Sequence, residues 1–268
     1  MDLITIINKI DLQNNLKEEV IDLVSKHKNE YLEYALNLTD LVLAEETFVK
    51  VAEKYQDDEY NKHILAIYML ACEEAYRKYK ESGISDEIFI DTMKCFTRFS
   101  DECLKKNGIC YFDRGFWTHR QTSLKLFRIG ELEYELVLQD GELFVSIHIP
   151  SDAVLTKELI LKSVYECKEF ISKYYPEYNA AKYVCGTWLL SPNLREYLKD
   201  GSRILQFQEF FEILNFNEDS KDFMDWLFMK DQNASILSLP EDTSLQRNVK
   251  KALLEGKKIG SAFAVLKI

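Results

Sequence analysis

The chain has 268 residues, of which 47% are hydrophobic and 29% charged, so it can bury a sizeable core and is not expected to be intrinsically disordered. Its 45 acidic and 34 basic residues give a net charge of −11, and no basic run is present that would neutralise a row of phosphates, so nucleic acid is not an expected partner. No apolar stretch reaches the roughly 18 residues that a membrane-spanning helix needs, so no membrane association is expected either.

The N-terminal residues and the cysteines indicate where the protein is expected to reside. Residues 1–7 contain neither a basic region nor a small-residue cleavage site, so we expect no export signal and a cytoplasmic location. The 6 cysteines include no C-x-x-C pair. We therefore expect reduced, mostly buried thiols and no metal site.

Residues 1–109 are predicted to form a helical N-terminal domain. Apolar residues recur with the helical period of 3.6 over residues 16–24 and again over residues 64–72. Ser85 is expected to begin the last helix, and Gly108 to end it after two lysines. We expect four or five packed helices with an acidic, solvated surface.

From residue 110 the hydrophobic period changes to 2, so the second predicted domain covers residues 110–268. Residues 116–127 are expected to form one more helix. Two alternating runs then flank Asp140-Gly141, which is the strongest short-range signal for a hairpin with a type I′ turn. In a hairpin with this two-residue loop, Glu133 faces His148, and the apolar residues of both strands share the opposite face.

The rest of the second domain alternates helices and strands. Thr156 is expected to cap a helix over residues 157–174, and the strand that follows reads as buried on both faces. The further expected elements are strands over 182–190, 209–216 and 261–267, and helices near Pro192 and over 220–229 and 243–255. The predicted fold class is α+β, with a helical bundle followed by a mixed β-sheet that helices flank and that contains one βαβ unit.

Five short sequence segments resemble those of a known family. They are Asp113 to Trp117, Leu126-Phe127-Arg128, Ser146 to Asp152, Tyr183-Val184-Cys185 and Trp188 to Pro192. Together they resemble a bacterial family of acyltransferases in which a helical N-acyltransferase N-terminal domain precedes a GNAT-like C-terminal domain. The resemblance covers nearly the whole chain. It implies a protein that moves an acyl group from acyl-CoA to an amine or another small-molecule nucleophile.

The resemblance also implies a place for the acyl-CoA. GNAT proteins bind its pyrophosphate on a Gly-rich loop between a strand and the next helix, which corresponds to residues 150–156 here. This segment contains no glycine, and Asp152 adds a negative charge. The groups expected to bind the anion are the hydroxyls of Ser151 and Thr156 and the N–H groups of the helix.

Transfer to an amine needs a base and an acid. His148 is the candidate base, with Glu133 opposite it to orient the ring; the alternative is a cross-strand ion pair on the surface. Tyr197 lies in the short helix after the 182–190 strand, where many GNAT enzymes carry the tyrosine that protonates the departing thiolate. The alternative for Tyr197 is a packing role.

Four residues are candidates for binding the small-molecule substrate. Arg114 and the adjacent Asp113 are expected to bind a carboxylate or phosphate, with an internal salt bridge between the two domains as the alternative. A ligand cleft is expected between the helical domain and the strand ends around His148, and Trp117 and Trp188 are expected to line it. A non-catalytic ligand-binding or interaction protein with a degenerate GNAT-like fold remains the second interpretation: the missing glycines favour it, whereas the Glu133–His148 pair favours an enzyme.

Overall fold

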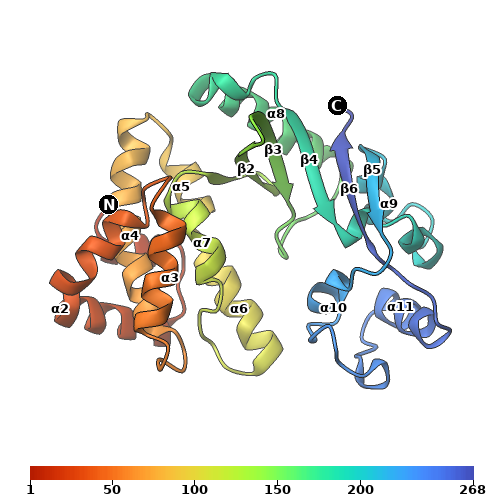
Figure 1. Ribbon diagram of the computed structural model, residues 1–268, viewed down its shortest axis with the longest axis horizontal. Helices are drawn as coiled ribbons and strands as arrows, with labels where there is room; N and C mark the ends of the chain where they lie inside the picture. The colour runs from red at the N-terminus through yellow and green to blue at the C-terminus, as the bar shows by residue number, and fades with distance from the viewer. The chain divides into compact units, whose positions relative to one another are not determined.

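The computed structural model describes all residues, 1–268, and divides into two compact units, Met1–Ile129 and Gly130–Ile268. The predicted α+β class is confirmed: helices make up the first unit, and a mixed sheet with helices makes up the second (Figure 1). None of the eleven α-helices combines the length and the apolar character that crossing a bilayer requires.

The first unit is a helical bundle built around one nearly buried helix, α4 (Lys62–Glu81). Residues Ile64 to Cys72 of α4 are all buried, and α2 packs along this helix. The remaining elements are α1 (Leu3–Lys9), α2 (Asn14–Asn37), α3 (Ala44–Lys54), α5 (Asp86–Met93), α6 (Cys95–Asn107), α7 (Gly115–Thr122) and the short strand β1 (Leu126–Ile129). The helices before residue 110 therefore number six, rather than the four or five predicted.

Two details of the first unit differ from the predicted elements. Ser85 caps a helix as expected, accepting from the Ile88 N–H, but this helix breaks at Lys94 into α5 and α6. Gly108 ends α6 with a left-handed φ of 74°, as predicted. The helix predicted over 116–127 is shorter, because Leu124 adopts a φ of 59° and the chain then continues as β1.

The segment after residue 110 packs on the first unit. The Tyr68 hydroxyl donates to the Gly115 carbonyl at 2.6 Å, inside the bundle. A Cβ at Gly115 would lie 2.6 Å from Phe48 Cε2, so the backbone approaches α3 more closely than a side chain would allow. For this reason the two units divide after Ile129 and not at the predicted residue 110.

The second unit is a twisted sheet whose strands lie in the order β2-β3-β4-β6-β5 (Figure 1). Strands β3 and β4 are parallel and the other neighbours are antiparallel, which confirms the predicted βαβ unit. The elements are β2 (Leu132–Gln139), β3 (Glu142–His148), α8 (Lys157–Tyr174), β4 (Lys182–Thr187), α9 (Arg203–Gln208), β5 (Phe211–Asn217), α10 (Asp222–Leu227), α11 (Ser244–Leu254) and β6 (Ser261–Leu266).

The strand predicted over 182–190 is shorter than expected. It ends at Thr187, whose hydroxyl accepts from the Leu189 N–H and starts a 3₁₀ turn over Trp188–Leu190. The predicted helix near Pro192 is a 3₁₀ helix, Asn193–Tyr197. Helix α9 is not among the predicted elements; Ser202 caps it through the Leu205 N–H.

A hydrophobic cluster holds α10 and α11 together. The buried residues of this cluster are Phe223, Met224, Phe228, Val249, Ile259, Trp188, Leu194 and Leu239. All 6 cysteines are free and all but Cys110 are buried, as the sequence predicts. Thiol burial without metal-ligating partners fits a packing role.

Glu30 of α2 contacts the side chains of Lys54 and Tyr55 on the bundle surface. The Lys54 ammonium and the Tyr55 hydroxyl each lie 2.7 Å from Glu30 Oε1. Hydrogen bonds from Lys54 and then Tyr55 lower the pKa of Glu30 from 4.5 to about 2. Because the folded pKa is lower than the unfolded one, this carboxylate stabilises the fold above pH 4.5, and the contribution disappears as the pH falls toward 2.

We expect Glu30→Gln to reduce the loss of stability on acidification. The carboxylate is 41% exposed, so solvent screening keeps the effect below about 1 kcal/mol. The free energy of unfolding, measured by urea denaturation at several pH values from neutral to acid, should fall less steeply in the variant than in the parent. Parallel curves for the two proteins would contradict the assignment.

Candidate active site

The β2–β3 hairpin determines which residues lie on each face of the sheet. Asp140 and Gly141 both have positive φ, 53° and 81°, as the predicted type I′ turn requires. The predicted register is confirmed: Glu133 pairs with His148 and Glu135 with Ser146. Alternation therefore places these four residues on one face, which we call the His148 face.

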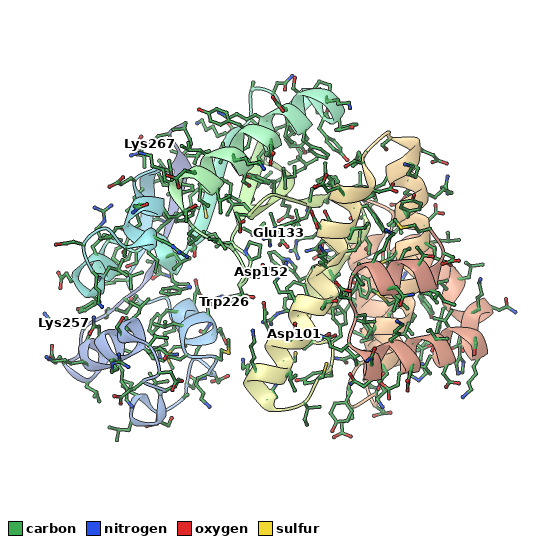
Figure 2. The ribbon with its side chains drawn as sticks, turned by 180° about the vertical axis from the view of Figure 1, so that it is seen from behind. Asp101, Glu133, Asp152, Trp226, Lys257 and Lys267 are labelled. Atoms are coloured by element: carbon green, nitrogen blue, oxygen red, sulfur yellow. The ribbon has the colours of Figure 1, made fainter.

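The opposite face is the one that α8 covers. The Tyr134 hydroxyl and Ser163 Oγ of α8 are 2.9 Å apart, and both side chains are buried. Because Tyr134 alternates with Glu133 and Glu135, its contact with α8 fixes which face of β2 the two carboxylates occupy. Figure 2 labels Glu133 on β2 and Asp152 in the loop after β3.

A histidine and a carboxylate meet on the His148 face. His148 Nε2 lies 3.0 Å from Glu135 Oε2, and their side chains are 25% and 9% exposed. The sequence named Glu133 as the partner carboxylate, and Glu133 is the residue directly opposite in the register. Glu135 is its diagonal neighbour, which long side chains also reach across a strand pair. That diagonal reach is the signal by which the sequence could have indicated Glu135.

This pair has the geometry of an oriented base. A carboxylate at hydrogen-bond distance fixes the plane of the imidazole. The ring keeps partial exposure, so a substrate atom has access to it, whereas the carboxylate is almost covered. The arrangement suits removal of a proton from a nucleophile during its attack.

The strands that carry this site separate at their carboxyl ends. Strands β3 and β4 pair from Phe144 with Lys182 to Ser146 with Val184. Beyond that point β3 continues to His148. Strand β4 continues to Thr187, and over these residues it pairs only with β6, its neighbour on the side away from β3. The ends of two parallel strands lie at the same edge of a sheet, where open α/β folds bind their ligands.

The loop after β3 leads to the start of α8. Thr156 caps α8 with an extended backbone, φ −81° and ψ 149°, and its side chain makes no cap hydrogen bond to the helix. Ser151 is exposed and Thr156 half-buried. The first-turn N–H groups of an α-helix have no acceptor within the helix, so this end can bind an anion, although Glu158 stands in the first turn.

Neither Tyr197 nor Trp188 contacts the His148–Glu135 pair in the structure. Trp188 is 8% exposed inside the hydrophobic cluster of α10 and α11, and Tyr197 packs against the same cluster. Burial, followed by the nearby charges of Glu196 and Glu255, raises the pKa of Tyr197. Packing accounts for the position of both side chains.

Asp113, Arg114 and Trp117 belong to the first unit. Arg114 lies 3.9 Å from Asp113 and 3.6 Å from Glu102, so it joins a group of carboxylates. Trp117 on α7 stacks with the Arg120 guanidinium at 4.1 Å. Arg114 therefore takes part in salt bridges, but both partners belong to the same unit, whereas the alternative expected from the sequence joined the two domains.

A cavity that the sequence did not indicate lies on the His148 face. It has a volume of about 420 Å³ and is lined by Val137, Gln139, Asp140, Glu142, Phe144, Ser146, Val184 and Phe263. We call it the sheet pocket. A second cavity of about 380 Å³ shares Phe263 with it and is lined by Gly186 and by polar residues of β5, β6 and α10.

Comparisons with known proteins agree with the fold. The GNAT-like C-terminal domain model matches residues 126–266, and the N-acyltransferase N-terminal domain model matches residues 1–124. No curated protein matches the chain.

Solved structures of acyltransferases share the fold at low sequence identity. One in complex with decanoyl-CoA has a TM-score of 0.81 and 17% identity, covering 98% of this chain and 86% of that chain. A mutant in complex with octanoyl-CoA has a TM-score of 0.80 and 18% identity, with the same coverage. A third, in complex with CoA and 10C-teicoplanin, has a TM-score of 0.77 and 18% identity, covering 97% and 86%.

Proposed function

The chain belongs to the N-acyltransferase family with a GNAT-like C-terminal domain, and we propose that it transfers an acyl group from acyl-CoA to an amine or another small nucleophile. The family predicted from the sequence is confirmed. One observation carries the proposal: the parallel strands β3 and β4 stop pairing at Ser146 and Val184, and His148 stands at that edge with Glu135 holding its ring.

We propose that the CoA part of the donor lies between the diverging strands and reaches the start of α8. The Thr156 hydroxyl makes no cap bond to the helix, so it is available with the first N–H groups of α8 for the pyrophosphate, and Ser151 lies in the preceding loop. The solved acyltransferases in complex with decanoyl-CoA and octanoyl-CoA support this proposal through their shared fold.

In the proposed reaction His148 accepts a proton from the attacking amine. The C–N bond forms at the thioester carbonyl, the C–S bond then breaks, and the CoA thiolate leaves and takes up a proton. Glu135 holds the ring by Nε2 and so fixes its orientation. Tyr197 as the acid that protonates the thiolate stays a prediction from the sequence.

The remaining site residues stay predictions of the sequence. Asp113, Arg114 and Trp117 are proposed to contact the small-molecule acceptor, and the charges of Arg114 and Asp113 suit a polar one. For Trp188 we propose a supporting role in the fold of the second unit. The cytoplasmic location also stays a prediction. A non-catalytic binding protein is not favoured, because both family models describe acyltransferase domains.

Gly186 offers a test of the donor site. It lies on β4 just beyond the last β3–β4 pair, on the His148 face. A Cβ there would meet only Phe263 Cδ2, at an ordinary 3.6 Å, so alanine fits without strain. A leucine there would project from the His148 face beside Phe263, next to the point where β3 and β4 stop pairing.

We expect Gly186→Leu to weaken acyl-CoA binding at least about tenfold, since a filled site loses its apolar and polar contacts with the ligand. Gly186→Ala, the matched control, should stay within about threefold of the parent. Calorimetric titration with octanoyl-CoA measures both, and a melting curve checks folding. If the parent itself binds no acyl-CoA, the proposed function is wrong.

A further inference from the structure

We infer that Glu131 competes with the donor for the loop that precedes α8, so that acyl-CoA binds by displacing the Glu131 carboxylate from a backbone N–H group. Glu131 thereby lowers the affinity of the protein for the phosphates of the donor. This inference rests on the proposed function, because it concerns the phosphate site proposed at the start of α8. The residues that carry it all belong to the second unit.

A hydrogen bond joins Glu131 to this loop. The Val154 N–H donates to Glu131 Oε2 at 2.6 Å. Val154 lies two residues before Thr156, the N-cap of α8, within residues 151–155, which we call the donor loop. A bond from an N–H to a carboxylate is charge-assisted and roughly twice as strong as a neutral one. A phosphate oxygen is an acceptor with the same sign of charge, so a phosphate and Glu131 compete for the Val154 N–H.

Two neighbouring N–H groups have neutral partners. The Ala153 N–H donates to the Pro150 carbonyl at 3.0 Å, and the Thr156 N–H donates to the Val154 carbonyl at 2.9 Å. Both acceptors belong to the same short segment as their donors. The Val154 N–H is the one of these three whose acceptor is an ionised side chain from another part of the unit. The protein therefore supplies its own anion at a place where the donor loop is able to bind one.

The backbone of Glu131 is fixed, whereas its side chain is able to leave the loop. Gly130 has a φ of 59°, and a Cβ there would lie 3.1 Å from Ser163 Cβ, so this backbone packs directly on α8. Leu132, on the other side of Glu131, is buried and begins β2. The contact between Glu131 and Val154 lies at the surface. A rotation of the Glu131 side chain therefore suffices to release the N–H without moving a strand or a helix.

The charge of Glu131 also opposes the donor through space. The pyrophosphate and the 3′-phosphate of CoA are negatively charged, and like charges near a protein surface repel more strongly than in bulk water. Glu158, exposed in the first turn of α8, carries the same charge but makes no bond to the donor loop. Salt screens a charge at a distance far more than a direct contact. A comparison of these two glutamates therefore separates displacement at Val154 from general repulsion.

Glu131→Gln and Glu131→Ala should tighten the binding of octanoyl-CoA about five- to tenfold. The alanine removes the competing acceptor, and the neutral glutamine amide holds the N–H less strongly than the carboxylate. S-octanoyl-pantetheine carries the same thioester without the phosphates, so its dissociation constant should stay within about twofold of the parent. Calorimetry on the full chain measures both ligands, and melting curves check folding. A purely structural role of Glu131 would give weaker binding in the variants, not tighter binding.

Glu158→Gln is the matched control. It removes the same charge from the same end of α8 and should tighten octanoyl-CoA by no more than about twofold at low salt. At about 0.5 M sodium chloride this gain should vanish, whereas Glu131→Gln should keep a gain of about threefold or more, because its effect arises at a direct contact.

The outcomes separate this inference from the proposed function. Octanoyl-CoA binding that is unchanged or weaker in both Glu131 variants overturns the inference and leaves acyl-CoA binding intact. Equal gains for Glu131→Gln and Glu158→Gln also overturn it, as do equal gains for octanoyl-CoA and S-octanoyl-pantetheine, because neither result depends on a phosphate at Val154. Absence of octanoyl-CoA binding in the parent would instead contradict the proposed function itself.

Discussion

His148→Ala is expected to lower kcat for acyl transfer by about 10²- to 10⁴-fold, the usual contribution of a positioned general base. The dissociation constant of octanoyl-CoA should stay within about twofold of the parent, because the proposed role of the ring is with the attacking nucleophile and not with the donor. Single-turnover transfer to an amine acceptor, with calorimetry for donor binding, measures both. An unchanged kcat would exclude His148 as the base.

Glu135 is expected to act as a positioning residue through His148. Glu135→Gln should lower kcat about 10-fold or more, and combining it with His148→Ala should lower kcat no further than His148→Ala alone, since residues that act as a unit are not additive. Glu133→Gln is the comparison, because the register set Glu133 opposite His148. If Glu133→Gln shows this non-additivity and Glu135→Gln does not, Glu133 is the orienting carboxylate, as predicted from the sequence.

Gly260→Ala should strongly destabilise the second unit. Gly260 has a φ of 77°, and a Cβ there would lie 2.7 Å from the Asn217 carbonyl oxygen and 2.8 Å from Glu218 Cα. The left-handed backbone costs about 1 to 2 kcal/mol, and the clash, which backbone atoms cannot relieve by rotating, adds about 1 to 3 kcal/mol. We expect a loss of about 3 kcal/mol and disturbed pairing of β6 with β5.

Gly256→Ala provides the matched control. Its φ is 76°, but nothing lies within 4 Å of an added Cβ, so only the backbone cost of about 1 kcal/mol should remain. Urea denaturation of the two variants isolates the contribution of the close approach. Equal losses of stability would show that Asn217 and Glu218 move aside at little cost.

Several elements followed from the sequence because their signals are local. The Asp140-Gly141 turn needs only two residues that accept positive φ, and the alternation around it allows one register, which the structure confirms. Helix α8 covers the predicted residues 157–174. In contrast, no local period records the break at Lys94 or the end of α7 before Leu124, which adopts a φ of 59°.

The sequence by itself determined which residue types alternate, where most strands and helices lie in the chain, and that His148 shares a face of β2–β3 with acidic side chains. Only the tertiary structure decided that Glu135 is at hydrogen-bond distance from the ring, that β3 and β4 separate beyond Ser146, and that Phe263 joins Phe144 in one pocket. The reason is physical: periodicity depends on neighbours along the chain, whereas diagonal contacts, strand separation and cavities depend on how β6 inserts beside β4, a pairing between segments about 80 residues apart.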